Sequence, residues 1–452
     1  MSDTEVNQRK FLSSLWKRLQ GDGIGAVLVR GASGSFGIMV LSSGIAFGTN
    51  VLLARILGVT QYGVYIYALT WINLLAWACQ IGLVTSLVRF VSAYNANKEW
   101  GLFRGILSRS IIYVMFATVI IGGAAAFVIW FLRDRMEPGQ VETLWIGLLI
   151  LPLIALTGLR HGALRGLKRV VLSSVPDGIV RPLLISVMVV LLYFWAQHSL
   201  TAMQVMLVNL IATLIAFIVG SMLLIKALPG QVRNVNPVYL GPEWLKVSLP
   251  MFFGSGMFLI LRQADVLMIG IIMGPTEAGI YAVVSRITSL VFFGSNAIDN
   301  IAAPMISELH SKEQYHRLQR MVTLAARGAF SFTFSMSIGL FLLGTYALSL
   351  FGQDFIIGYQ PMIILLVGMV IKSLFGSAGF LMSMTGHHTQ GAIIVGIAAV
   401  LNIMMNAVLI PRFGLMGAAI ATAVSNAIWS FAVLVYVLRR VDINPTIFAR
   451  IS

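Results

Sequence analysis

Long runs of apolar residues recur along the chain from about residue 33 to residue 438, with short polar connections between them. A helix crosses a bilayer with about 20 apolar residues at 1.5 Å per residue, and about twelve runs approach that length. Their approximate bounds are 33–54, 64–88, 110–132, 143–159, 171–196, 202–225, 247–273, 279–304, 328–350, 361–384, 391–410 and 415–438. The runs are continuous rather than alternating, so they predict helices and exclude a transmembrane β-barrel.

One short pattern, G-x4-G-x-Y, occurs at residues 58–65 and again 216 residues later at residues 274–281. A shared offset of nearly half the chain indicates a duplicated unit of six spans. Because six is even, both copies enter the membrane in the same orientation, which predicts parallel repeats. The sequence thus predicts an all-α polytopic membrane protein with two six-helix bundles. The glycines of the pattern, which we expect to form tight turns or hinges, are Gly58, Gly63, Gly274 and Gly279.

The polar connections divide the chain into five segments. We expect an N-terminal tail at 1–29, a first lobe at 30–227, a linker rich in Pro, Gly and Asn at 228–246, a second lobe at 247–440 and a C-terminal tail at 441–452. Most Lys and Arg residues fall in the connections on one side, together with both tails and the linker. This asymmetry predicts that both termini are cytoplasmic.

The composition changes the picture in two ways. The chain is 58% hydrophobic and only 10% charged, whereas soluble domains carry about 25% charged residues. Its net charge of +15 follows the positive-inside distribution, so it favours contact with anionic lipids over binding of nucleic acid. Cys79 is the single cysteine, which excludes a disulfide framework and a Cys-based metal site.

Polar residues repeat along one face of the first span and of the seventh. A spacing of seven residues is about two helical turns, so such residues share a face. The candidates for a polar path through the membrane in these two spans are Ser42, Thr49, Asn50, Ser255, Arg262 and Asp265. Either this face borders a central cavity, or its small polar residues only allow close helix packing. At the repeat offset, Asp265 corresponds to Thr49.

Charged residues inside the spans are few, and each is a candidate for the substrate path. Asp265 with Arg262, and Asp177 with Arg181, are close enough in sequence to form ion pairs.

Two further candidates, Arg286 and Lys372, have no acid nearby in sequence, and Lys372 is too near mid-span to reach the surface easily. Asp299 is interpreted as a helix-end or packing residue. Cations outnumber acids inside the spans, which suits an anionic substrate such as a pyrophosphate. No phosphate-binding loop, zinc-ligand spacing or nucleophile elbow is present, so we expect a transporter without catalytic residues, metal or cofactor.

Five motifs in order resemble the multidrug/oligosaccharidyl-lipid/polysaccharide (MOP) exporter superfamily, and most of all its polysaccharide branch, the Wzx-type flippases of O-antigen and capsule repeat units. They lie at residues 54–65, 82–91, 265–286, 350–355 and 402–422. The resemblance implies two bundles that form a V, a central cavity lined by spans 1, 2, 7 and 8, and alternating access.

The resemblance also implies a function, namely flipping of a polyprenyl-pyrophosphate-linked oligosaccharide across the bacterial inner membrane. Expected partners are membrane lipids, a polysaccharide polymerase and glycosyltransferases; coupling to a proton or a sodium gradient is left open.

Three alternatives are a cation-coupled multidrug exporter, a lipid II flippase and a non-transporting scaffold for glycan assembly. Drug-exporting relatives commonly carry an acid in the first span, where this chain has Thr49 and Asn50. Lipid II flippases carry arginines inside the first two spans, where this chain has only Arg55 and Arg89 at the span ends.

Overall fold

The computed structural model describes residues 24–197, 199–376, 378–441 and 443–449. Most of the predicted N-terminal tail, residues 1–23, lies outside this set. The described residues form helices and connections without a strand. The first half contains α2 (Ile24–Gln80), α3 (Leu83–Asn97), α4 (Trp100–Leu132), η1 (Arg133–Arg135), α5 (Gln140–Gly166), α6 (Val170–Val175), η2 (Pro176–Val180), α7 (Arg181–Trp195), α8 (Ala202–Ala227) and α9 (Gly230–Asn234). The second contains α10 (Gly241–Ile272), α11 (Pro275–Ser289), α12 (Phe292–Ser311), α13 (Tyr315–Ser349), η3 (Gln353–Gly358), α14 (Tyr359–Leu374), α15 (Ala378–Met384) and α16 (His388–Arg440).

The predicted number of spans is confirmed when the bent pair of helices is counted as one span and each interrupted helix as two. Nine helices of the described residues are long and apolar enough to cross a membrane, and α11 with the start of α12 forms a tenth span bent by 47°. Two of these helices, α2 and α16, are interrupted by non-helical backbone at Gly58 and Gly414. Each therefore contains two of the predicted runs, so the twelve expected spans are all represented.

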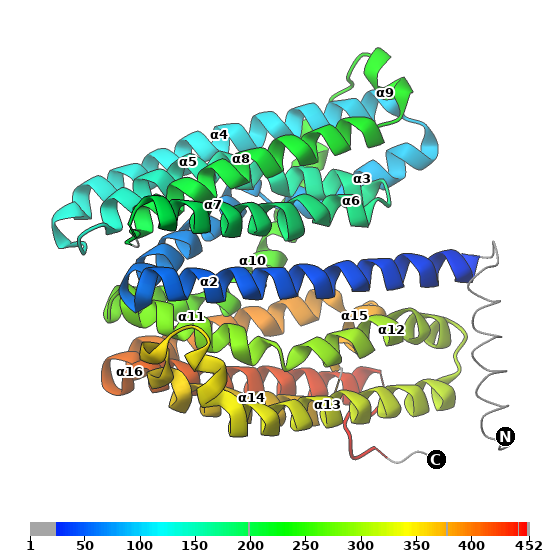
Figure 1. The fold of residues 1–452 in the computed structure, drawn as a ribbon. Helices are drawn as coiled ribbons and strands as arrows, with labels where there is room; N and C mark the ends of the chain where they lie inside the picture. Colours follow the sequence, from blue (N-terminus) through cyan, green and yellow to red (C-terminus); the bar gives the residue numbers. More distant parts are fainter. Residues whose placement is uncertain (1–23, 198, 377, 442, 450–452) are drawn as a thin grey trace, which may run out of the picture.

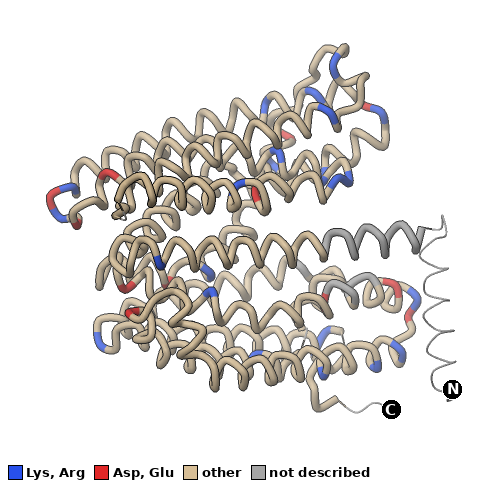
Figure 2. The backbone as a smooth tube through the Cα atoms, viewed as in Figure 1, with Lys and Arg blue, Asp and Glu red and all other residues tan. Residues whose placement is uncertain are grey.

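The spans form two bundles that meet at one end and diverge at the other (Figure 1). Helices α3 to α8 form one bundle and α10 to α16 the other, while the first part of α2 runs between them. Lys and Arg positions gather at the diverging end, and few lie at the end where the bundles meet (Figure 2). The expected V of two bundles is thus observed, open toward the basic end.

The two copies of the repeated pattern pack directly against each other where the lobes meet. Gly58 has a φ of 71° and Gly274 a φ of 117°, a backbone region that only glycine adopts at low cost. Gly63 and Gly279 have a different role, because they permit a close contact between the two turns. A Cβ atom on Gly63 would lie 2.2 Å from the Pro275 carbonyl oxygen, and one on Gly279 would lie 2.5 Å from Gly63 Cα.

Aromatic and polar contacts extend this closure. The ring of Tyr62 lies edge-on to that of Phe355, with centroids 5.7 Å apart. The Arg55 guanidinium donates a hydrogen bond of 2.6 Å from Nε to the Leu350 carbonyl oxygen. This carbonyl follows the C-terminus of α13, where the helix dipole favours a cation. Side chains from both lobes therefore close the end that carries few basic residues.

Helix α10 connects the lobes along its whole length. Ser248 and Ser86 are 2.7 Å apart through their Oγ atoms, and the rings of Phe252 and Trp77 stack with centroids 4.3 Å apart. Farther along, α10 packs mainly against α16 and α11. The first half of α10, where the second lobe is expected to begin at residue 247, thus contacts the first lobe as well.

The contact between the turns yields a prediction. Replacing Gly63→Ala should lower the melting temperature in detergent, because the added methyl must displace backbone of the other lobe; overpacking costs about 1–3 kcal/mol. Gly44→Ala is the matched control, since a Cβ there meets no atom within 4 Å and alanine favours a helix. Equal melting temperatures for Gly63→Ala and wild type would contradict the importance of this contact.

Candidate functional site

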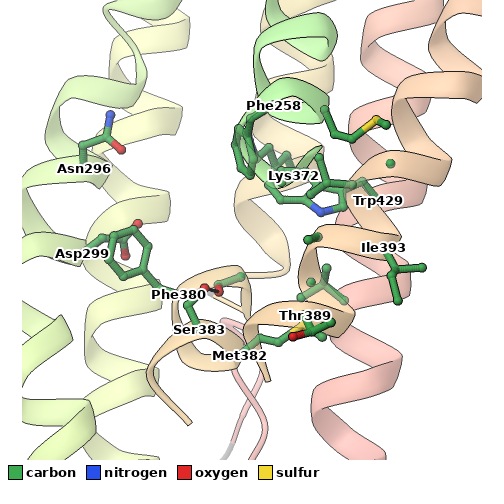
Figure 3. Close-up of a pocket in the computed structure, with 18 of the residues that line it drawn as sticks. Phe258, Asn296, Asp299, Lys372, Phe380, Met382, Ser383, Thr389, Ile393 and Trp429 are labelled. Atoms are coloured by element: carbon green, nitrogen blue, oxygen red, sulfur yellow. Dashed lines mark hydrogen bonds between the residues drawn. The ribbon is translucent and has the colours of Figure 1, made fainter. Parts of the chain in front are cut away.

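A cavity of about 1170 Å³ lies between α10, α12, α14, α15 and α16, with Arg89 of α3 contributing from the first lobe. Most of its wall is apolar and aromatic (Figure 3). In that view, Asn296 and Asp299 lie on one side of the cavity and Lys372 with Trp429 on the other. An apolar cavity with a few placed polar groups is the usual form of a small-molecule site.

Lys372 is the most distinctive polar group of this wall. Its Nζ lies 4.6 Å from the ring centroids of both Phe292 and Trp429, which is cation–π geometry. Asp299 and Arg262 are within electrostatic reach of the ammonium group. The interpretation of Asp299 as a mere helix-end or packing residue is incomplete, because it also lines the cavity.

The predicted ion pair between Arg262 and Asp265 is absent, although both residues belong to the described part of the chain. Arg262 is exposed, whereas Asp265 is only 5% exposed. Asp265 accepts hydrogen bonds from Tyr281 at 3.1 Å, Asn406 at 2.7 Å and Thr422. Its oxygens are therefore occupied by neutral donors from α11 and α16, and the arginine is left facing outward.

The predicted pair between Asp177 and Arg181 also does not form. Asp177 pairs instead with Arg160 of α5, and its Oδ2 lies 2.8 Å from His161 Nε2. The physical reason is the π-helical turn η2, which begins one residue before Asp177. Hydrogen bonds from i to i+5 change which residues share a helix face. Arg181 turns to another helix and donates to Asn209 Oδ1 at 2.9 and 3.2 Å.

The candidates of the first span pack against neighbouring helices. Thr49 is buried, with Oγ1 2.9 Å from Ser186 Oγ on α7. Asn50 accepts a hydrogen bond of 3.2 Å from the Tyr62 hydroxyl, which itself lies 3.5 Å from Arg286 Nη1 of the other lobe. This part of the first span therefore joins helices and lobes in the conformation observed.

Ser42 is half-buried and donates to a backbone carbonyl of its own helix. Ser255 is exposed and accepts a hydrogen bond of 3.2 Å from Trp77 Nε1. Of the nine predicted path residues, Lys372 alone lines the large cavity. The sequence analysis missed the aromatic pair around Lys372, because Phe292 and Trp429 belong to distant spans that the fold brings together.

Comparisons with known proteins agree with this architecture. The sequence model of the family described as "Polysaccharide biosynthesis protein" matches residues 28–310. The chain belongs to the polysaccharide biosynthesis protein family. This family agrees with the motif resemblance to the polysaccharide branch of the MOP superfamily.

One relative of this family member is the "Probable low-salt glycan biosynthesis flippase Agl15" of Haloferax volcanii. The two are 26% identical over 165 residues, which span 36% of this chain and 35% of the relative. The match therefore covers only about a third of the relative's length.

Solved structures share the fold. A structure described as the inward-facing conformation of a multidrug resistance MATE family transporter superposes with a TM-score of 0.71 at 14% identity, covering 91% of this chain and 98% of that one. An outward-facing MATE structure gives a TM-score of 0.60 at 15% identity, covering 94% and 97%. A MOP superfamily transporter from Pyrococcus furiosus gives 0.63 at 14%, with the same coverage. The family model and the shared fold indicate a multi-pass membrane protein of polysaccharide biosynthesis.

The buried ion pair of the first lobe gives a second prediction. Asp177→Ala should lower the free energy of unfolding by about 3–5 kcal/mol, because Arg160, only 3% exposed, would keep a buried charge without its partner. Thermal melting of the purified protein in detergent measures this.

The matched control is Asp134→Ala, which removes the exposed pair with Arg133 and should change stability by no more than about 0.5 kcal/mol. A similar, small effect of both substitutions would contradict a structural role for the pair between Asp177 and Arg160.

Proposed function

We propose that this flippase moves a polyprenyl-pyrophosphate-linked oligosaccharide across the bacterial cytoplasmic membrane by alternating access. The glycan and the pyrophosphate cross between the lobes, while the polyprenyl chain stays in the bilayer. The family and the relative support a flippase of polysaccharide biosynthesis, and the chemistry of the cavity beside α10 supports the anionic headgroup.

One observation carries the proposal, namely the different placement of acids and cations. Asp177 and Asp265 are held inside the lobes by their own partners. Arg262 and Arg89 are exposed, and Arg89 lines the cavity together with Lys372. Cations in a site with low-dielectric walls attract an anion more strongly than in water. Asp299 also lines this wall, so two cations face one acid there, and the excess of positive charge favours an anion over a cationic drug.

The composition of the wall suits the rest of the headgroup. Aromatic rings such as Phe258, Phe380 and Trp429 line the cavity with Lys372, and flat rings offer surface to sugar faces as well as to apolar groups. Ser383, Asn296 and neighbouring polar residues of this wall offer hydrogen bonds to hydroxyl groups. The cavity thus combines phosphate-binding and sugar-binding chemistry.

The orientation follows from the basic connections. The positive-inside rule places the basic, diverging end in the cytoplasm, with both termini. The lobes then open to the cytoplasm and close on the outer side, a state that loads substrate from the inner leaflet. Glycosyltransferases that build the lipid-linked glycan would act before this step, and a polymerase that consumes the repeat unit would act after it.

Transport of a defined glycolipid tests the proposal. The wild-type protein in proteoliposomes should transfer a fluorescent polyprenyl-pyrophosphate oligosaccharide between leaflets. Lys372→Ala and Arg262→Ala should each slow the transfer about 10- to 100-fold, the effect of losing a hydrogen bond to a charged group.

Lys312→Ala is the matched control, because this exposed lysine pairs with Glu308 on the surface and should leave transport unchanged. The proposal fails if the glycolipid keeps its leaflet while a cationic dye is pumped, a result that would indicate a drug exporter. A non-transporting scaffold would show no transfer of the glycolipid, and neither Lys372→Ala nor Arg262→Ala would impair its function.

A further inference from the structure

A second pocket of the second lobe lies apart from the cavity beside α10. Its volume is about 340 Å³, and it is lined by His310, Tyr315, His387, Arg440 and Val441. None of these residues lines the large cavity. Small-ligand pockets have volumes of about 300–1,000 Å³, so this pocket suits a small group rather than a whole lipid-linked glycan.

Two turns with left-handed backbone bring the histidines to this pocket. The chain reverses between α12 and α13 through Glu313, whose φ is 55°. Tyr315 therefore returns beside His310, with ring centroids 6.1 Å apart. Gly386, with a φ of 87°, turns the chain from α15 toward α16, and His387 follows directly. Side chains that are distant in sequence thus meet where α12, α13 and α16 begin or end.

The polar side chains of the pocket are hydrogen-bond donors. The Thr385 hydroxyl donates to the Leu381 carbonyl at 2.9 Å, so its oxygen accepts from Nδ1 of His387 at 3.3 Å. Nε2 of His387 is then the ring nitrogen available to a ligand. Arg440 is the last residue of α16 and forms no ion pair with a described residue. Among the described residues, no carboxylate lines the pocket, which leaves it positive.

His310 gives an independent indication of a ligand. The residue is half-buried, and its Nδ1 is buried without a hydrogen-bond partner in the described part of the chain. Such buried, unpartnered polar atoms are rare in folded proteins, because each loses its hydrogen bonds to water. An unpartnered nitrogen on a residue that lines a pocket of donors indicates a group that the protein atoms do not supply.

We propose that this pocket binds a phosphate group. Phosphate oxygens accept several hydrogen bonds at once, and the Arg440 guanidinium, two imidazoles and the Tyr315 hydroxyl are matching donors. A metal ion fits less well, because protein zinc sites use three or four ligands. The described residues contain no group of three or more His, Cys, Asp or Glu side chains that could hold one.

The position of the pocket suits the phosphate of a lipid headgroup. The turn between α12 and α13 lies at the diverging end of the molecule (Figure 1), where Lys and Arg gather (Figure 2). Tyr315 and Arg440 are exposed, so the pocket is open to its surroundings. Basic pockets between helices on the cytoplasmic side are typical binding sites for anionic lipid headgroups. Free phosphate has the same binding chemistry, and the experiment below distinguishes the two sources.

A bound phosphate would hold several helix ends together. The chain continues from Arg440 into residues 443–449, which lie along α13. Gln319 of α13 forms hydrogen bonds of 2.7 and 2.8 Å with the backbone of Asn444, and Ile443 is buried. A phosphate between Arg440 and His310 would add a link from α16 to α12 beside this attachment. The ligand should therefore stabilise the folded second lobe.

Thermal melting of the purified, delipidated full-length protein in a neutral detergent tests the site. Phosphatidylglycerol should raise the melting temperature by about 2 °C or more above that in an equal concentration of phosphatidylcholine, because a ligand that binds the folded state stabilises it. A second arm compares sodium phosphate with sodium chloride of equal ionic strength.

Arg440→Gln should remove most of the stabilisation, because it deletes the charge of the pocket. Arg439→Gln is the matched control and should retain the effect, since it removes the same charge from the neighbouring exposed residue, which does not line the pocket. His387→Gln should reduce the stabilisation at least twofold, and it decides the matter if Arg440→Gln does not fold.

Stabilisation by phosphatidylglycerol alone would support a lipid ligand, and stabilisation by sodium phosphate would support free phosphate. The proposal is overturned if neither arm stabilises the wild-type protein, or if the stabilisation survives Arg440→Gln. An equal loss in Arg439→Gln would also overturn it, because general surface charge would then explain the effect. The outcome is independent of the proposed function, since no lipid-linked glycan is used.

Discussion

The structure depends on one constraint, namely that a charge or a backbone polar group at membrane depth must have a partner. Backbone groups are satisfied within helices, which is why the described chain is helical throughout its apolar runs. Charged side chains have two solutions, a partner inside a lobe or a position facing the space between lobes. Asp177 and Asp265 take the first solution, whereas Lys372 lines the cavity and Arg262 is exposed.

The placement of the charged residues determines the chemistry of the cavity beside α10. Asp177 and Asp265 are held by other groups, whereas Asp299 lines the cavity within electrostatic reach of Lys372. The Lys372 Nζ lies 4.6 Å from the centroids of two aromatic rings. The cavity is apolar over most of its wall, and its charged residues are Arg89, Lys372 and Asp299. Asp265 forms no ion pair among the described residues and is held by neutral donors instead.

The two lobes meet through glycine rather than through large interlocking side chains. Gly63 and Gly279 bring the backbones of two turns into contact, and Tyr62, Arg55 and Phe355 close the surrounding surface. Contacts of this kind would suit a joint that opens in the proposed transport cycle, since they include no ion pair of the described residues. Helix α10 contacts both lobes and therefore links them physically.

The sequence by itself determined the helical class, the twelve spans, the duplication and the family, because apolar run length and a repeated motif are local properties of the chain. It also identified Lys372 and Asp265 as residues that need an explanation. Only the tertiary structure decided their partners. The pairs inferred from adjacency failed because a π-helical turn and donors from distant spans, such as Asn406 and Arg160, changed which groups meet. Proximity across helices depends on packing, and spacing along one helix does not contain that information.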